Sequence, residues 1–328
     1  MSRVLSALER RLTTPRSKRR AQRRRGLRER GGRACGALGD SVLIWPLLRA
    51  LARQEHVVKL VTADSLGRLA AIELNQQLGA PIVSHVALDG PRWTPLWQGE
   101  RGPIEEGPGI DVLVSFLADD TTEGGRRWLA AARETFPRAE VVIAGPPASV
   151  TRSALWRRFR VEPFGRVDAR PPTRGPVVFA VGAGGKHKRW ALERWGTLFD
   201  RVRTAHPALR IQVIAGPVEQ DVFSKKEQAA FNELVKRGHW SGYVNRLSDL
   251  ANVLRQARCV VSADSGPAHL AAQLGTPTLA LFGPTDAAVW SPVGPSVHTL
   301  SPSEPTTDVS WLSDEHAMAT LTSLGWLR

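Results

Sequence analysis

The sequence is poor in cysteine and contains no long apolar run, and each absence narrows the class of protein. Cys35 and Cys259 are the only cysteines in 328 residues, and they form neither a CxxC pair nor a disulfide framework. Such a low cysteine content is typical of proteins in a reducing cytoplasm. No stretch of eighteen apolar residues is found, and no apolar signal region follows the basic N-terminus. We therefore expect a cytoplasmic protein without a membrane-spanning helix.

Net positive charge is also small outside one short segment. The net charge is +14, but residues 1–33 carry +11 and the other 295 residues carry only +3. A nucleic-acid-binding protein gathers its cations on a folded face. The charge pattern therefore predicts no nucleic-acid partner for the folded part, and it assigns the excess to an N-terminal tail, residues 1–33.

The tail divides into two parts. Its first twelve residues place Val4, Leu5, Leu8 and Leu12 on one helical face, and the remainder has almost nothing to bury. A short amphipathic helix followed by a polybasic run favours a tether to an anionic membrane surface. An inert solvated tail and an RNA-binding arm stay open, although the tail has no aromatic residues to stack on bases.

After the tail, short apolar runs alternate with helical patterns, which predicts parallel sheets with helical crossovers. Strands are expected at 57–62, 111–117, 140–145, 177–182, 210–216, 258–264 and 277–283. Helices are expected at 65–78, 123–135, 191–204, 224–236, 247–256 and 267–274. The breaker-rich segment 168–176 reads as a linker. The fold class is therefore α/β, with two doubly wound, Rossmann-like domains (34–170 and 171–328) facing a ligand-binding cleft.

One turn in the second domain combines an acid, two small residues and a proline. The stretch "SADSGPAHL" places Asp264, Ser265, Gly266 and Pro267 between a strand and a helix. A proline suits the first helical turn, and a glycine lets another group approach the backbone. Free N–H groups and the helix dipole then make an anion site. An ordinary capped turn explains the same residues and stays open.

Similar turns recur after other strands. They are "GALGD" ending at Asp40, "GAGGKHK" ending at Lys188, "GPVE" ending at Glu219, and "GPTD" ending at Asp286. One ordinary turn needs no ligand, but a shared polar cleft explains the set better. Lysines, helix N-termini and carboxylates suit a diphosphate and a hydroxylated sugar.

The stretch "SADSGPAHLAAQLGTPTLALFGPTD", together with "GALGDSVLIWPLLRAL", "KRWALERWGTLFDRV" and "IAGPVEQD", resembles glycosyltransferase family nine, the ADP-heptose:lipopolysaccharide heptosyltransferases. The resemblance covers residues 36–51 and 177–294. It implies a glycosyltransferase B fold and an inverting transfer that uses no metal and no cofactor. The donor would be ADP-heptose and the acceptor a lipid-linked saccharide such as lipopolysaccharide core, at the cytoplasmic face of the inner membrane.

The resemblance also implies a role for individual residues. Asp40 matches the general base, Lys188 the lysine at the donor phosphate, and Glu219 the acid on the ribose. Asp264 matches the acid that holds sugar hydroxyls, and Ser265, Gly266 and Pro267 match the diphosphate-binding helix start. Asn245 falls where a backbone contact to adenine is expected. The chemistry is coherent, because a single displacement needs a base and positive groups for the leaving diphosphate.

Several residues keep more than one interpretation. Asp119–Asp120 could be a metal pair, but two acids opening a helix or loop are more often N-caps. His269 is expected to pack or cap, with a donor contact as the alternative, and Cys35 to be a bystander. Arg92 and Arg101, near Trp93 and Trp97, are candidates for the acceptor. The family's first strand should precede Gly36, yet "LRERGGRAC" is a poor strand.

Two functional alternatives also stay open. One is a glycosyltransferase of the same family that uses another nucleotide sugar. The other is a catalytically silent relative that only binds a nucleotide sugar. The presence of Asp40, Lys188, Glu219 and Asp264 together argues against the silent relative.

Overall fold

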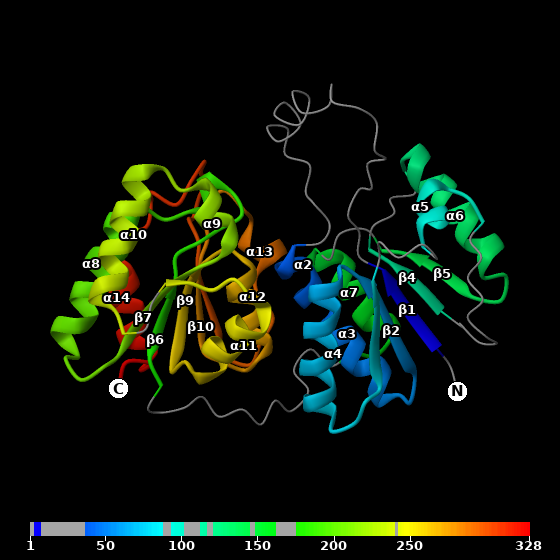
Figure 1. The fold of residues 1–328 in the computed structure, drawn as a ribbon, viewed down its shortest axis with the longest axis horizontal. Helices are drawn as coiled ribbons and strands as arrows, with labels where there is room; N and C mark the ends of the chain where they lie inside the picture. The colour runs from blue at the N-terminus through cyan, green and yellow to red at the C-terminus, as the bar shows by residue number, and fades with distance from the viewer. Residues whose placement is uncertain are drawn as a thin grey trace. The chain divides into compact units, whose positions relative to one another are not determined.

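The computed structural model describes residues 3–7, 37–87, 93–101, 112–116, 121–144, 148–161, 175–239 and 242–328. The chain divides into two compact units, one of Met1–Ser41 and Leu48–Pro147 and one of Val42–Leu47 and Ala148–Arg328. Each unit has its own parallel sheet (Figure 1). No helix among the described residues is long and apolar enough to cross a membrane.

The sheet of the first unit has the order β3-β2-β1-β4-β5, and every pairing is parallel. Its strands are β1 (Arg3–Ala7), β2 (Val57–Thr62), β3 (Val83–Ala87), β4 (Val112–Ser115) and β5 (Glu140–Ile143). The accompanying helices are α2 (Leu38–Leu43), α3 (Trp45–Arg53), α4 (Asp64–Leu78), α5 (Thr94–Gln98) and α6 (Glu123–Thr135). The division between the units runs through α2 and α3.

Strand β1 differs from the sequence-based expectation. Residues 3–7 are the middle strand of this sheet, with Val4 opposite Val58 on one side and Val112 on the other (Figure 1). The helix predicted over residues 1–12 is therefore wrong at 3–7. A local apolar pattern cannot show that two distant strands offer their backbone hydrogen bonds to this segment. The strand expected just before Gly36 lies at Arg3–Ala7, and residues 8–36 fall outside the described part.

The sheet of the second unit has the order β11-β10-β9-β6-β7-β8, and it is again parallel throughout. Its strands are β6 (Val177–Ala180), β7 (Ile211–Ala215), β8 (Gly242–Tyr243), β9 (Cys259–Ala263), β10 (Thr278–Leu281) and β11 (Val297–Leu300). The helices are α7 (Ser149–Arg158), η2 (Lys186–Lys188), α8 (Leu192–Ala205), α9 (Pro217–Val222), α10 (Lys225–Arg237), α11 (Leu247–Gln256), α12 (Gly266–Gln273), α13 (Ala287–Trp290) and α14 (Asp314–Ser323).

The strand order of this sheet reverses between β6 and β9. From β6 the chain adds β7 and β8 on one side, and from β9 it adds β10 and β11 on the other. In doubly wound sheets, ligands bind in the crevice beyond the carboxyl ends of the strands at such a switch point. The segments that follow β6 and β9 are therefore where a ligand site is expected.

An aromatic cluster fixes the helix layer against β6. Phe179 on β6 lies with its ring centroid 5.5 Å from that of Trp195 on α8, and Trp190 meets Trp195 edge-on at 5.1 Å. All three side chains are buried. Figure 1 shows α8, α10 and α14 on one side of the sheet and α11 and α12 on the other. This packing holds both ends of the segment between β6 and α8, which contains η2.

Candidate active site

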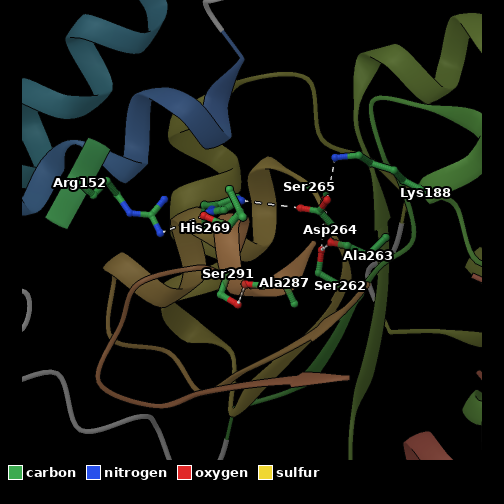
Figure 2. Close-up of polar contacts among 10 residues, drawn as sticks. Arg152, Lys188, Ser262, Ala263, Asp264, Ser265, His269, Ala287 and Ser291 are labelled. Carbon is green, nitrogen blue, oxygen red and sulfur yellow. Dashed lines mark hydrogen bonds and ion pairs between the residues drawn. The ribbon is translucent and has the colours of Figure 1, made fainter. Parts of the chain in front are cut away.

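The switch point brings together a lysine and a carboxylate. Lys188 Nζ donates to Asp264 Oδ2 at 2.7 Å (Figure 2). Lys188 ends η2, which follows β6, and Asp264 directly follows β9, where its backbone N–H donates to Leu281 O on β10. The Asp264 side chain is 5% exposed and that of Lys188 is 36% exposed. The carboxylate is thus fixed, whereas the ammonium is near enough to solvent to meet a ligand.

The start of α12 adds an uncapped helix N-terminus beside this pair. Ser265 is the N-cap residue, but its hydroxyl donates to Ala263 O at 3.1 Å and makes no side-chain cap. The first turn contains Gly266 and Pro267 and no acidic residue. Backbone N–H groups and the helix dipole at such an end attract anions. The three residues predicted for the diphosphate, Ser265 to Pro267, therefore form the start of α12, directly after Asp264, the residue predicted for the sugar hydroxyls.

His269 lies in the first turn of α12, close to the same carboxylate. Its Nε2 is 3.9 Å from Asp264 Oδ1, and its buried Nδ1 has no hydrogen-bond partner (Figure 2). Burial lowers the pKa of His269 to about 4; Asp264 opposes this shift, and the charges of Arg152 and Lys188 add to it. The imidazole is therefore neutral near pH 7. Its burial agrees with the packing interpretation, and a contact with a donor stays a prediction.

Arg152 is a residue that sequence reasoning did not single out. It comes from α7, is 6% exposed, and donates from Nη2 to Val289 O on α13 at 3.3 Å. Burial lowers the pKa of its guanidinium to about 10, which leaves it charged near pH 7. Figure 2 shows it on the far side of His269 from Asp264. Nothing in "SVTRSALWRR" distinguishes this arginine from its neighbours, because its burial depends on contacts with α13.

Glu219 lies at the adjacent strand ends. It is 5% exposed, and its Oε2 accepts the backbone N–H of Gly216, the residue that follows β7, at 3.0 Å. Its carboxyl group also lies against Gly182, which follows β6. Burial raises the pKa of Glu219, while the Gly216 N–H and the charge of Arg189 oppose the rise. The residue predicted to bind the ribose therefore has a buried carboxylate, which is held between the turn that follows β6 and the turn that follows β7.

The other predicted site residues belong to other elements. Asn245 is exposed after β8, and Arg101 is exposed after α5. Asp40 is partly buried in the first turn of α2 and belongs to the first unit. Arg92, Cys35 and Asp119–Asp120 lie outside the described residues.

The family profile described as glycosyltransferase family 9 (heptosyltransferase) matches residues 146–315, slightly more than half of the chain. The chain belongs to glycosyltransferase family 9. The match confirms the family expected from the turn at Asp264, and it contains Lys188, Glu219, Asn245 and Asp264. Asp40 and the acceptor candidates lie before the matched region.

Curated relatives point to the same family. The chain is 26% identical over 153 residues to lipopolysaccharide heptosyltransferase 3 of Escherichia coli, which covers 47% of this chain and 41% of that protein. It is 32% identical over 110 residues to lipopolysaccharide heptosyltransferase 1 of Salmonella typhimurium, which covers 34% of this chain and 32% of that protein. The matches thus span about a third to two fifths of these relatives.

Solved structures share the fold along nearly the whole chain. Heptosyltransferase WaaC of E. coli with ADP superposes with a TM-score of 0.63 at 16% identity, covering 99% of this chain and 100% of that one. A family 9 glycosyltransferase of Veillonella parvula has a TM-score of 0.64 at 14% identity, with coverages of 98% and 96%. These likenesses confirm the α/β fold of the glycosyltransferase B class for this family 9 chain.

Metal ligands do not gather in the described part of the chain. Within those ranges, no group of three or more His, Cys, Asp or Glu side chains is placed to hold a metal ion. Because Asp119–Asp120 lies outside them, metal independence of this family 9 chain stays a prediction.

Proposed function

We propose that the chain is an inverting, metal-independent glycosyltransferase that moves heptose from ADP-heptose to a lipid-linked saccharide acceptor such as lipopolysaccharide core. The observation that carries the proposal is the Lys188–Asp264 pair beside the uncapped start of α12. A cation and free helical N–H groups suit a diphosphate, and a buried carboxylate suits sugar hydroxyls. Two solved structures that share the fold are E. coli heptosyltransferase WaaC with ADP and the same enzyme with ADP-2-deoxy-2-fluoro heptose.

In the proposed reaction, an acceptor hydroxyl attacks the anomeric carbon as the bond to the donor diphosphate breaks. Asp40 takes the proton of that hydroxyl as general base. Negative charge then builds on the departing ADP. Lys188 and the N-terminus of α12 stabilise this charge: the helix N-terminus is already in place, and the partly exposed lysine turns from Asp264 toward the phosphate.

The remaining residues hold the donor. Asp264 accepts hydrogen bonds from the sugar hydroxyls when Lys188 turns toward the phosphate. Glu219 accepts from the ribose hydroxyls, and the backbone at Asn245 contacts adenine. Each of these acceptors is a carboxylate or a backbone group at the end of a strand, where polar ligands of doubly wound sheets bind.

Basic residues are assigned to the acceptor and the membrane. Arg92 and Arg101 are proposed to contact an anionic acceptor. The basic residues of segment 8–33 are proposed to hold the enzyme at an anionic membrane surface, in keeping with a cytoplasmic enzyme that is peripheral on the inner membrane. No nucleic acid is expected to bind.

The test is a thermal-unfolding panel with ADP-heptose, ADP-glucose, UDP-glucose and GDP-mannose, followed by a transfer assay read by mass spectrometry. A ligand stabilises the native state by RT ln(1 + [L]/Kd), so the panel ranks donors without an acceptor. We expect ADP-heptose to give the largest rise in Tm. Lys188→Ala should erase the rise, and the matched control Lys186→Ala should keep most of it.

Other outcomes favour the alternatives. A response to a different sugar nucleotide would mean a family member with another donor. Binding of ADP-heptose without ADP release, with lipopolysaccharide-core acceptors present, would mean a silent relative. If no sugar nucleotide raises Tm, the proposed donor site is wrong.

A further inference from the structure

A concave site lies in the second unit beside the start of α8. It is a hollow of about 400 Å³, within the size range of small-molecule sites. Lys186 and His187 of η2 line it, whereas the next residue, Lys188, pairs with Asp264. The hollow is therefore adjacent to the proposed donor site but is built from different side chains.

Its inner surface is apolar and its edge is charged. Val181, Trp190 and Val309 are at most 2% exposed and line the inside. Phe223 adds an aromatic wall. The charged lining residues come from η2, the residue after it, α8, α10 and the segment before α14. They are four cations and three carboxylates: Lys186, Arg189, Arg194 and Lys226 against Glu193, Glu227 and Asp308.

Arg189 is the unusual member of this lining. Its side chain is only 10% exposed, and its guanidinium lies over the Phe223 ring at 5.4 Å. Nη1 is 3.4 Å from Glu227 Oε1, outside hydrogen-bond geometry, and both Nη1 and Nε are buried without an acceptor. These two nitrogens have almost no accessible surface, so a ligand in the hollow reaches the guanidinium only at its third nitrogen, Nη2. The buried charge has no hydrogen-bonded anion, and it therefore favours one in the adjacent hollow.

The N-terminus of α8 opens into the same hollow. This helix has fourteen residues, and its N-cap, Ala191, has no side chain that can cap. Ala191, Leu192 and Glu193 all line the hollow. The positive end of the helix dipole and the Arg189 guanidinium therefore act on one space.

The carboxylates around the hollow already have donors. Glu193 accepts from its own backbone N–H and pairs with Lys226 at 3.3 Å. Glu227 accepts from the backbone N–H and hydroxyl of Ser224 at 2.8 and 2.7 Å. Asp308 accepts from the Ser310 N–H at 2.9 Å. None of these carboxylates makes a hydrogen bond to Arg189 Nε or Nη1.

We propose that this hollow binds the anionic group, phosphate or carboxylate, of a small molecule other than the sugar donor, with Arg189 and the start of α8 as its principal donors and Phe223 and Trp190 against its apolar part. The shape accounts for both halves of such a ligand, because the charged donors lie beside buried apolar walls. The proposal stands independently of the proposed glycosyl transfer.

The direct test follows the Nε–H resonance of Arg189 by NMR in the full chain, assigned by its loss in Arg189→Lys. Inorganic phosphate is titrated in one arm and acetate in the other, so that the two anion chemistries are separated. We expect at least one arm to give a saturable shift with a Kd of about 1 mM or lower. An unmoved resonance in both arms at about ten times that concentration would mean that the hollow holds only water.

Calorimetry then assigns the site. Phosphate is titrated into Lys188→Ala, in which the donor turn is weakened, with and without a second change. Adding Arg189→Gln should weaken binding about tenfold, the value of one charge-assisted hydrogen bond. Adding Lys186→Ala, an exposed side chain whose loss spares the fold, should weaken it by less. Affinity that is unchanged by both second changes, or abolished by Lys188→Ala alone, would overturn the proposal.

Discussion

Glu219 and Gly182 fit against each other so closely that any Cβ at residue 182 would force the Glu219 carboxyl group to move. A Cβ built there would lie 2.4 Å from Glu219 Cδ and 2.5 Å from Oε2. The two residues follow different strands, β7 and β6. The position of the carboxylate is thus set by the absence of a methyl group on the neighbouring strand end.

We expect Gly182→Ala to push the Glu219 carboxylate out of place. The overpacking should cost about 1–3 kcal/mol of unfolding free energy, and ADP should bind more weakly because the ribose loses its acceptor. Gly184→Ala is the matched control, since nothing lies within 4 Å of a Cβ at Gly184. The measurements are denaturant unfolding and ADP titration. Equal effects of the two changes would contradict a role for the Gly182–Glu219 contact.

Removal of the Lys188 amine should have two separable effects. Lys188→Ala leaves the buried Asp264 carboxylate without its hydrogen-bonded cation, which should lower stability by roughly 1–3 kcal/mol. It should also weaken donor binding and slow loss of the diphosphate. Lys186→Ala should do neither to the same degree, as measured by unfolding and by kcat and KM. Equal losses from the two lysines would show that Lys186 serves the phosphate.

Asp40→Asn tests the proposed base. The substitution keeps the shape of the side chain and removes its proton-accepting strength. We expect turnover to fall by roughly two to four powers of ten, with little change in donor affinity, because α12 and η2 are untouched. The measurements are single-turnover transfer and donor titration. Transfer at a near-normal rate would show that Asp40 is not the general base and has only a structural place in the first turn of α2.

His269 should make stability depend on pH. Its pKa is about 4 in the folded chain and 6.5 for an unperturbed histidine, so between these values the unfolded chain binds more protons. The free energy of unfolding should therefore decrease as pH falls from 6.5 to 4, by about 3 kcal/mol at most. His269→Gln should remove this part of the decrease. The measurement is the difference between the two unfolding curves against pH; a difference that does not vary with pH would contradict the prediction.

Membrane binding by the basic segment has to be tested with a variant that keeps β1 intact. Removing residues 1–30 would delete Arg3–Ala7 and with it the middle strand of the first sheet, so we expect that truncation to unfold the first unit. Replacing the basic residues between Arg16 and Arg33 by serine should instead abolish co-sedimentation with anionic vesicles. Binding by the unaltered chain should weaken with salt, because screening acts over about 10 Å at 0.1 M. Salt-independent binding would argue against the tether.

Much of the fold could be predicted from the sequence, because strong local hydrophobic patterns coincide with the helices and strands. The run 57–62 is β2, the helix over 123–135 is α6, and that over 247–256 is α11. Elements with weak patterns were missed. β8 has two residues, and α9 is six residues next to a proline turn. β1 was missed because its partners lie far along the chain.

Part of the candidate site could be predicted from the sequence for a similar reason. Asp264 to Pro267 are contiguous, so one motif shows them together, and Lys188 follows a glycine turn that suggests phosphate. The place of Arg152 in the site could not be predicted, because only the packing of α7 on α13 makes it a buried cation. The contact of Glu219 with Gly182 was also hidden, since each turn taken alone looks ordinary.

The central place of β1 has a consequence for folding during synthesis. Val4 pairs with Val58 and with Val112, so β1 is synthesised before both of its neighbours, and the second of them follows only about a hundred residues later. Such non-local pairings slow folding and leave unpaired strand edges exposed meanwhile. The second sheet has no comparable dependence on the N-terminus, because all six of its strands lie within Val177–Leu300. A ribosome-bound chain that ends before residue 112 should therefore lack a complete first sheet, however long it is given to fold.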